Sequence, residues 1–294
     1  MGEIAGIQAS VGASPGKAAS PQVRKLWLCA DDYGMSPAVS RGIRELIGRR
    51  RLNATSVMVT APSFSSAEAR ALSELGGVAI GLHFTLTAPF RPAAGGYGPT
   101  GPNGVFLSLP GTLATGLLRR FDSHALATEV ASQFAAFREA FGRAPDFVDG
   151  HQHVHLLPQV SDAVLDAMKR MAPGAWVRQC GRTAPLWRRW GDPKGLLLDV
   201  LSARLRRRCA ALGIATNPAF AGTYNFKRPA AFETLFESFL QDLPDGGLVM
   251  CHPGFVDAEL QRLDDLTAVR EREFAFFAGE RFPAMLAAQG FGLV

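Results

Sequence analysis

The chain has 294 residues and a mass of 31.5 kDa, and 47% of its residues are apolar, which suits one large α/β domain or two small ones. No apolar run approaches the ~20 residues of a membrane-spanning helix, and four cysteines without CxxC spacing favour reduced thiols and a cytoplasmic location. The net charge of +5 is unevenly distributed: Trp176–Arg228 holds 11 Lys and Arg against 2 Asp and Glu, and the remainder holds 20 against 24. A positive charge of +9 in one segment and −4 elsewhere does not predict a nucleic-acid-binding protein.

Apolar, strand-like runs alternate with segments of helical periodicity along most of the chain. The first 22 residues are rich in Ala, Gly and Ser and lack the features of a secretory signal, which predicts a disordered tail. The predicted strands are Leu26–Ala30, Thr55–Val59, Val78–Leu82, Phe147–Asp149, Trp176–Arg178, Leu248–Cys251 and Phe291–Val294. The predicted helices are Pro37–Ile47, Ala67–Leu75, Leu126–Phe141, Val160–Met171, Leu196–Leu212, Phe232–Leu240 and Leu266–Phe277.

This alternation predicts parallel strands joined by right-handed crossovers. About seven such units in ~270 residues favour an α/β fold of the distorted (β/α) barrel type, similar to a TIM barrel, over a two-domain doubly wound protein. We expect residues 23–294 to form this single domain. Its variable loops should lie near residues 89–110, where Gly and Pro are crowded, and near residues 180–228.

Titratable side chains directly follow four of the predicted strands. Asp31 and Asp32 follow the first strand, His83 follows the third, and His252 follows the run Leu248-Val-Met-Cys251. The stretch from Asp149 onwards brings one carboxylate and three of the chain's six histidines together within seven residues. Active sites of (β/α) barrels lie at the carboxyl ends of the strands, so we expect these groups to converge there.

These residue types predict a metal site with nitrogen and oxygen ligands. The candidate ligands are Asp32, His83 and one or two of His151, His153 and His155. Two imidazoles and one carboxylate suit Zn²⁺, Mn²⁺, Co²⁺ or Fe²⁺ and leave positions open for water. A run of three buried imidazoles without ligands or partners would be costly, which favours the metal site over a structural role.

Two further residues are candidates for proton transfer. Asp31 is placed to take a proton from water, provided that the chain turns after it, because neighbouring side chains of a straight strand point to opposite faces. Tyr33-Gly34 is the expected turn. His252 comes from a distant strand and is a candidate proton donor to a leaving amine.

Four motifs follow one another along the chain. They are Ala30-Asp-Asp-Tyr-Gly-Met-Ser36, Gly81-Leu-His-Phe-Thr-Leu-Thr87, Asp149-Gly-His-Gln-His-Val-His155 and Met250-Cys-His-Pro-Gly-Phe255. In kind and order they resemble the motifs of the YdjC-like carbohydrate deacetylases, a group that includes chitooligosaccharide deacetylases and hopanoid-associated relatives. The resemblance extends from about residue 26 to the C-terminus. It implies a distorted (β/α) barrel that hydrolyses an N-acetyl group from an amino sugar in an oligosaccharide or glycolipid.

The resemblance also implies a role for each candidate residue. One divalent ion, Mg²⁺ or Zn²⁺ with Mn²⁺ and Co²⁺ as alternatives, would be held by Asp32, His83 and His151. The catalytic residues would be Asp31 as general base and His252 as proton donor. Since metal-bound imidazoles commonly need supporting partners, the resemblance leaves that task to Asp149, His153 and His155.

Two other interpretations remain open. A metal-dependent amidohydrolase or phosphoesterase would usually place an HxH strand early in the chain and use more than one metal, whereas here the carboxylates come first. A non-enzymatic carbohydrate- or lipid-binding barrel would use the basic segment, residues 178–228. That segment is either a solvated helix face or a patch that meets a glycolipid or the inner surface of a membrane. The expected partner is an N-acetylated amino sugar, and no nucleic acid is expected.

Overall fold

The computed structural model describes residues 23–98, 100–182, 192–226 and 231–294, so the predicted tail, residues 1–22, lies outside the described residues. Within these ranges eight strands form one sheet, and every pairing in it is parallel. The strand order is β5-β4-β3-β2-β1-β7-β6, and β8 pairs with the start of β1. The strands are β1 (Arg24–Tyr33), β2 (Ala54–Val57), β3 (Ala79–Phe84), β4 (Phe147–Gly150), β5 (Trp176–Val177), β6 (Phe220–Ala221), β7 (Gly247–Cys251) and β8 (Phe291–Leu293).

The sheet curls into a distorted barrel because its two ends meet. The backbone N–H of Val177 in β5 donates to the carbonyl of Ala215, which lies just before β6 (3.0 Å). The side-chain oxygen of Asn217 also accepts a hydrogen bond from the N–H of Gln179 (2.9 Å). The predicted α/β barrel of parallel strands is confirmed, and its closure is a short seam because β5 and β6 have only two residues each.

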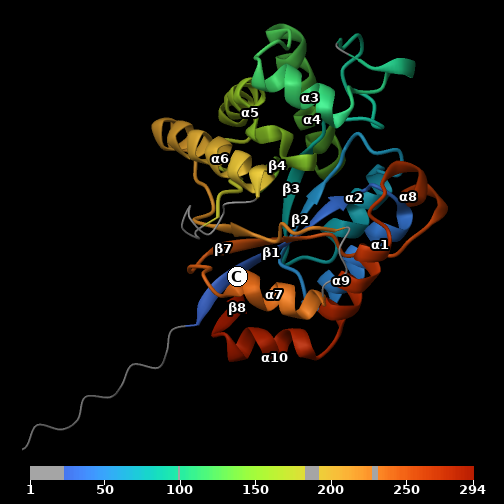
Figure 1. Cartoon of the computed structure of the whole chain (residues 1–294). Helices are drawn as coiled ribbons and strands as arrows, with labels where there is room; N and C mark the ends of the chain where they lie inside the picture. Colours follow the sequence, from blue (N-terminus) through green and yellow to red (C-terminus); the bar gives the residue numbers. More distant parts are fainter. Residues whose placement is uncertain (1–22, 99, 183–191, 227–230) are drawn as a thin grey trace, which may run out of the picture.

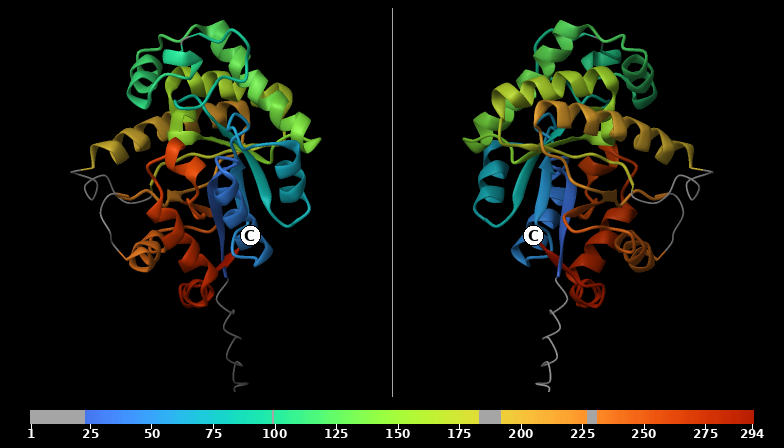
Figure 2. Two further views of the ribbon diagram at one scale, coloured as in Figure 1. Left: turned by 90° about the vertical axis from the view of Figure 1, so that its right-hand side faces the viewer. Right: turned by 90° about the vertical axis from the view of Figure 1, so that its left-hand side faces the viewer.

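Helices surround the sheet (Figures 1 and 2). In Figure 1, α3, α4 and α5 lie above the strands, and α7, α9 and α10 lie below them. The helices are α1 (Pro37–Gly48), α2 (Ser66–Ser73), α3 (Leu109–Leu117), α4 (Ser123–Phe141), α5 (Pro158–Met171), α6 (Pro193–Leu212), α7 (Phe232–Leu240), α8 (Ala258–Leu263), α9 (Ala268–Ala278) and α10 (Arg281–Ala288). None of the helices in the described ranges is both long and apolar enough to cross a membrane.

Most predicted elements are present, and the differences have local causes. α1 begins as expected, because the hydroxyl of Ser36 accepts from the N–H of Val39 (3.3 Å) and Pro37 occupies the first helical position. The predicted loop over residues 89–110 instead contains a 3-10 turn at 102–104 and the start of α3, whose glycines hide its helical character. The helix expected over 196–212 is α6, which begins three residues earlier, and the helix expected over 266–277 is α9, preceded by the separate helix α8.

β1 is the central strand and positions the start of the site. From Leu26 to Tyr33 every residue except half-buried Trp27 is buried, as expected for a strand covered on both faces. β2 and β7 flank its carboxyl end. On the β7 side, Phe277 of α9 packs against Phe236 of α7 and Phe282 of α10, with ring centres 5.4 and 5.1 Å apart. This packing fixes α9, which supplies two further side chains to the site.

Candidate active site

A bulge at the end of β1 brings two adjacent carboxylates into the barrel. The register between β1 and β2 shifts between Ala30 and Tyr33, and Asp32 has a φ of 69°, in the left-handed region that Asp tolerates better than most residues. Asp31 and Asp32 therefore do not point to opposite faces; both line the same cavity and are buried. The turn that the sequence requires begins at Asp32 itself, before the expected position at Tyr33-Gly34.

The ends of β1, β3 and β4 bring the three predicted metal ligands together. Asp32 Oδ1 lies 3.3 Å from Nε2 of His83 and 3.0 Å from Nδ1 of His151. One ligand atom from each of the three residues lies within 4.8 Å of the others, and all three side chains are buried. Ligand atoms that share one ion at ~2.0–2.2 Å are themselves roughly 3 Å apart, so this donor set fits a single divalent cation.

His83 is held in place from behind by a carboxylate. Its Nδ1 donates to Asp149 Oδ1 (2.6 Å), and the hydroxyl of Ser56 lies 2.9 Å from the same nitrogen. This orients Nε2 toward Asp32, which is the carboxylate–imidazole arrangement typical of metal-binding histidines. Burial lowers the pKa of His83, but the negative charges of Asp149 and Asp31 and the hydrogen bonds to Asp149 and Asp32 raise it to about 10.

Arg178, at the end of β5, joins two of the carboxylates. Its guanidinium donates to both oxygens of Asp31 (2.8 and 2.7 Å) and lies 2.6 Å from Asp149 Oδ2. Burial raises the pKa of Asp31, but the charges of Arg178 and His83 and the hydrogen bonds from Arg178 outweigh it and hold the pKa well below its usual value. A second cluster of possible ligands, Cys29, Asp31 and Asp149, is therefore already occupied by a cationic side chain.

Arg270 of α9 holds one oxygen of Asp32. Its guanidinium donates to Asp32 Oδ2 (2.7 Å) and to Asp264 Oδ2 (2.7 Å), which leaves Asp32 Oδ1 directed at the two histidines. Burial raises the pKa of Asp32, but the charge of Arg270 and the hydrogen bonds from His151 and His83 keep it well below its usual value. Both aspartates are therefore carboxylates at neutral pH.

The histidine run after β4 is a turn rather than an extended strand. Gln152 and His153 both have positive φ values, 53° and 61°, so the three histidines do not face the same way. His151 lies with Asp32 and His83, the other two predicted ligands, and His153 lines the cavity beside it. His155 points away from the cavity and donates to the carbonyl of Arg178 (2.8 Å). Its ring lies against Gly150, where a Cβ would come within 2.9 Å of Nδ1, so a glycine is required there.

The cavity at the mouth of the barrel has a volume of about 260 Å³. Asp31, Asp32, His151, His153 and His252 line it, whereas the remaining predicted residues lie behind it. His252 follows β7, and its backbone N–H donates to Glu273 Oε2 of α9 (2.5 Å). Its Nδ1 is buried and has no hydrogen-bond partner among the described residues. All candidate residues thus meet at one end of the barrel, with His155 oriented away from the cavity.

Sequence reasoning missed four residues that complete the site, namely Ser56, Arg178, Arg270 and Glu273. Arg178 lies at the end of a predicted strand, as the candidate aspartates and histidines do, and this position alone indicates that its side chain belongs to the site. Arg270 and Glu273 lie within a predicted helix, three residues apart, where they are indistinguishable from ordinary surface charges of an amphipathic helix.

Known proteins resemble this chain in fold or in sequence. A crystal structure from Enterococcus faecalis V583, of a protein with a proposed role in cellobiose-phosphate cleavage, superposes with a TM-score of 0.71 at 20% identity, covering 93% of this chain and 97% of that one. Chitooligosaccharide deacetylase from Serratia marcescens is 30% identical over 244 residues, which is 79% of this chain and 82% of that protein. A carbohydrate deacetylase from Homo sapiens is 34% identical over 152 residues, 51% of this chain and 46% of the human protein. The family model described as YdjC-like protein matches residues 25–288, so the chain belongs to the YdjC-like family.

Proposed function

We propose that the protein is a carbohydrate de-N-acetylase that hydrolyses the N-acetyl group of an amino sugar with one divalent ion held by Asp32, His83 and His151. The observation that carries the proposal is the convergence of these three ligands, two of which line the cavity, beside the carboxylate of Asp31. Membership of the YdjC-like family and the deacetylase names of the relatives support the same reaction. Two imidazoles and one carboxylate favour Zn²⁺, Mn²⁺ or Co²⁺ over Mg²⁺, which prefers oxygen ligands.

A divalent ion in this position would supply Lewis acidity, which polarises an amide carbonyl and acidifies a water molecule. Asp31 accepts the proton of the attacking water. Because Arg178 binds both oxygens of Asp31, the carboxylate cannot rotate, and its remaining lone pairs are available to the cavity. The same ion pair weakens Asp31 as a base, so the water must be acidified for the transfer to occur near neutral pH.

His252 completes the reaction from the strand next to β1, because Cys251 of β7 pairs with Ala30 of β1, and His252 and Asp31 directly follow these two residues. It reaches the cavity from β7 and donates a proton to the sugar nitrogen as the C–N bond breaks, which yields acetate and a free amine. The hydrogen bond from its backbone N–H to Glu273 fixes the start of the loop that carries it. Thus the acid and the base come from different strands, and each is oriented by a buried residue of opposite charge or by a buried acceptor.

The experiment that tests this proposal measures acetate release from a panel of N-acetylglucosamine-bearing compounds, with and without chelator. We expect release that chelator abolishes and that Zn²⁺, Mn²⁺, Co²⁺ or Mg²⁺ restores to different extents. Elemental analysis should give one ion per chain. Two ions per chain with phosphoester hydrolysis would favour an amidohydrolase or phosphoesterase, and chelator-insensitive glycan binding without turnover would favour a binding barrel.

One observation favours a lipid-linked sugar as the substrate. Leu113 of α3 and Leu197 of α6 line the cavity, and both helices continue into exposed apolar side chains, with Leu118 59% and Val200 65% exposed. The next turns of α6 carry exposed arginines. We infer that this rim contacts an anionic membrane surface while the sugar enters the cavity. Co-sedimentation with anionic but not neutral vesicles, lost in Val200→Glu and unchanged in Val23→Glu at another exposed valine, tests it.

A further inference from the structure

A second, larger cavity continues from the first. The catalytic cavity, at about 260 Å³, falls below the ~300–1,000 Å³ typical of pockets that enclose a whole small-molecule ligand. The outer cavity has a volume of about 770 Å³ and shares four lining residues with it, namely Lys194, Thr223, Phe226 and Leu266. A substrate whose acetamido group reaches Asp31 therefore has space to extend into the outer cavity.

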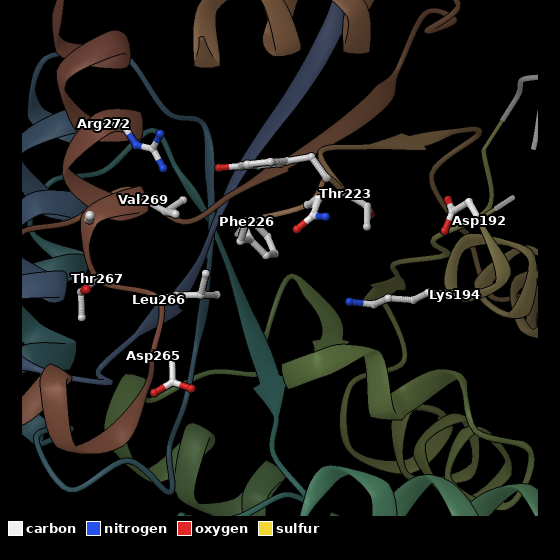
Figure 3. A pocket seen from close by; sticks show the side chains of 12 residues that line it. Asp192, Lys194, Thr223, Phe226, Asp265, Leu266, Thr267, Val269 and Arg272 are labelled. Atoms are coloured by element: carbon white, nitrogen blue, oxygen red, sulfur yellow. The ribbon is translucent and has the colours of Figure 1, made fainter. Parts of the chain in front are cut away.

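The lining of the outer cavity combines aromatic rings with polar side chains. Tyr224 and Phe226 follow β6, and their ring centres are 4.4 Å apart. In Figure 3, Lys194 of α6 and Arg272 of α9 lie on opposite sides of Phe226, and Asp265 lies below it. An aromatic surface with hydrogen-bonding groups around it suits the apolar face and the hydroxyl groups of a sugar ring.

Two contacts connect this wall to the proposed proton donor. The hydroxyl of Tyr224 donates to Glu273 Oε1 (2.6 Å), and the other oxygen of the same carboxylate accepts from the backbone N–H of His252 (2.5 Å). Because one buried carboxylate makes both hydrogen bonds, a shift of Glu273 would disturb Tyr224 and His252 together. In addition, the ring of Phe226 meets the ring of His252 edge-on, with centres 5.6 Å apart.

We infer, on the basis of the proposed function, that the outer cavity binds the next sugar unit of an oligosaccharide and that its occupation positions His252 through Tyr224 and Glu273. The binding energy of this second sugar unit, which does not itself react, then helps to hold His252 in position for proton transfer. For this reason a shortened substrate loses kcat and not only affinity. Tyr224 and Glu273 are positioning residues in this scheme, because they act on the reaction through His252.

The test compares kcat for N-acetylglucosamine with kcat for a trisaccharide of three linked N-acetylglucosamine units. We expect the trisaccharide to have a kcat at least about tenfold higher in the wild type, and this ratio to fall toward one in Tyr224→Phe. Glu273→Gln keeps an acceptor for the N–H of His252 and a partner for the Tyr224 hydroxyl, so it should preserve most of the ratio. Tyr97→Phe, which removes a buried hydroxyl without a partner among the described residues, is the matched control and should leave the ratio unchanged.

An unchanged ratio in Tyr224→Phe, or equal kcat values for the two substrates in the wild type, would overturn the inference while leaving the deacetylase activity in place. If no compound releases acetate, the proposed function itself has failed, and the cavity is tested by calorimetric titration. In that case the trisaccharide should bind about tenfold more tightly than the monosaccharide, and Phe226→Ala should remove the difference. Equal affinities in the wild type would exclude the outer cavity as a sugar site.

Discussion

The two sides of the barrel mouth differ in how their side chains are held. On the side of β1, β3 and β4, the carboxylates of Asp31, Asp32 and Asp149 are buried and each binds an arginine or a histidine, and often both. On the side of β5 and β6, two-residue strands meet at a short seam. The end of β5 supplies Arg178 to the network, and the segment after β6 forms part of the wall of the outer cavity. One side is a connected network of charges, and the other consists mainly of chain segments between elements.

This difference separates two tasks. Chemistry on an amide requires the ligands, the base and the proton donor to be in position before the substrate arrives, and a buried network of opposite charges provides that rigidity. Binding of different sugars requires a surface that can vary, and segments outside regular elements tolerate variation. We therefore expect substitutions in the network to abolish activity and substitutions at the seam to change stability with little effect on turnover.

Asp32→Ala should have the largest effect. It removes one predicted ligand and leaves the guanidinium of Arg270 buried beside Asp264 alone, and removing one partner of a buried pair costs about 3–5 kcal/mol. We expect no bound metal by elemental analysis, no acetate release, and a lower denaturant midpoint. Asp162→Ala is the control, because this partly exposed carboxylate binds Arg119, Arg204 and Arg208 outside the site, where solvent screens the charges, and its loss should cost clearly less than that of Asp32. One ion per chain in Asp32→Ala would contradict the ligand assignment.

Asp31→Asn should leave the metal in place and remove most turnover. The amide keeps the size of the carboxylate but cannot accept a proton from water, so we expect kcat to fall by about 10²–10⁴. Elemental analysis and steady-state kinetics on the same preparation provide the measurement. Loss of metal with activity retained would refute the role of Asp31 as base.

Arg178→Lys should reduce kcat by about 10–100-fold, as is common for residues that support metal ligands or catalytic groups. Lysine keeps the positive charge but cannot bind both oxygens of Asp31 and also reach Asp149. Arg204→Lys, at the partly exposed pair with Asp162, is the matched control and should leave kcat unchanged. Equal activities of the two variants would show that charge alone is sufficient at position 178.

The sequence predicts the convergence of the three proposed ligands well because one geometric rule applies to them. Carboxyl ends of parallel strands share one edge, so Asp32, His83 and His151 converge although they are 51 to 119 residues apart in the chain. The rule does not distinguish His151 from His155, because this depends on the positive φ values of Gln152 and His153, which no residue type in that run demands.

The arginines illustrate what sequence patterns do not contain. Arg178 and Asp31 are 147 residues apart, and Arg270 and Asp32 are 238 apart, so no periodicity or spacing relates the partners. The pairs exist because burial makes an unpartnered carboxylate costly, and only the packed structure determines which cation is near enough. Similarly, β6 has two residues, too few for a periodic signal.

Metal binding should release a proton. The pKa of His83 is raised to about 10, above the ~6.5 of an unperturbed histidine. Below pH 10 the metal-free imidazole therefore carries a second proton, on Nε2, and this proton must leave before Nε2 can bind a cation. Lowering the pH favours the protonated form, so affinity should fall by up to about tenfold per pH unit between pH 9 and pH 6. Calorimetric titration with Zn²⁺ in buffers of different ionisation enthalpy measures the protons released. Release near zero at pH 7 would contradict the raised pKa.

The smallest effect on turnover is expected at the seam, where two asparagines allow a matched comparison. Asn217 accepts from the N–H of Gln179 (2.9 Å) and donates to the carbonyls of Gln179 and Ala219, whereas Asn53 accepts from the N–H of Leu28 (2.8 Å) and donates to the carbonyl of Leu26. Either alanine variant leaves buried backbone groups without partners, at a cost of about 1–3 kcal/mol.

The two variants should differ in where this cost appears. Asn53 joins β1 to the start of β2 within the main sheet, so Asn53→Ala should lower the stability of the whole barrel and speed hydrogen exchange in every strand that opens by global unfolding. Asn217→Ala should speed exchange mainly in residues 176–181 and 215–221, with kcat reduced less than about threefold, because the seam opens as a local unit. If Asn217→Ala instead speeds exchange in β1 and β3 as much as Asn53→Ala does, the seam and the network unfold together. The short closure would then be as important for holding the metal ligands as the central strands.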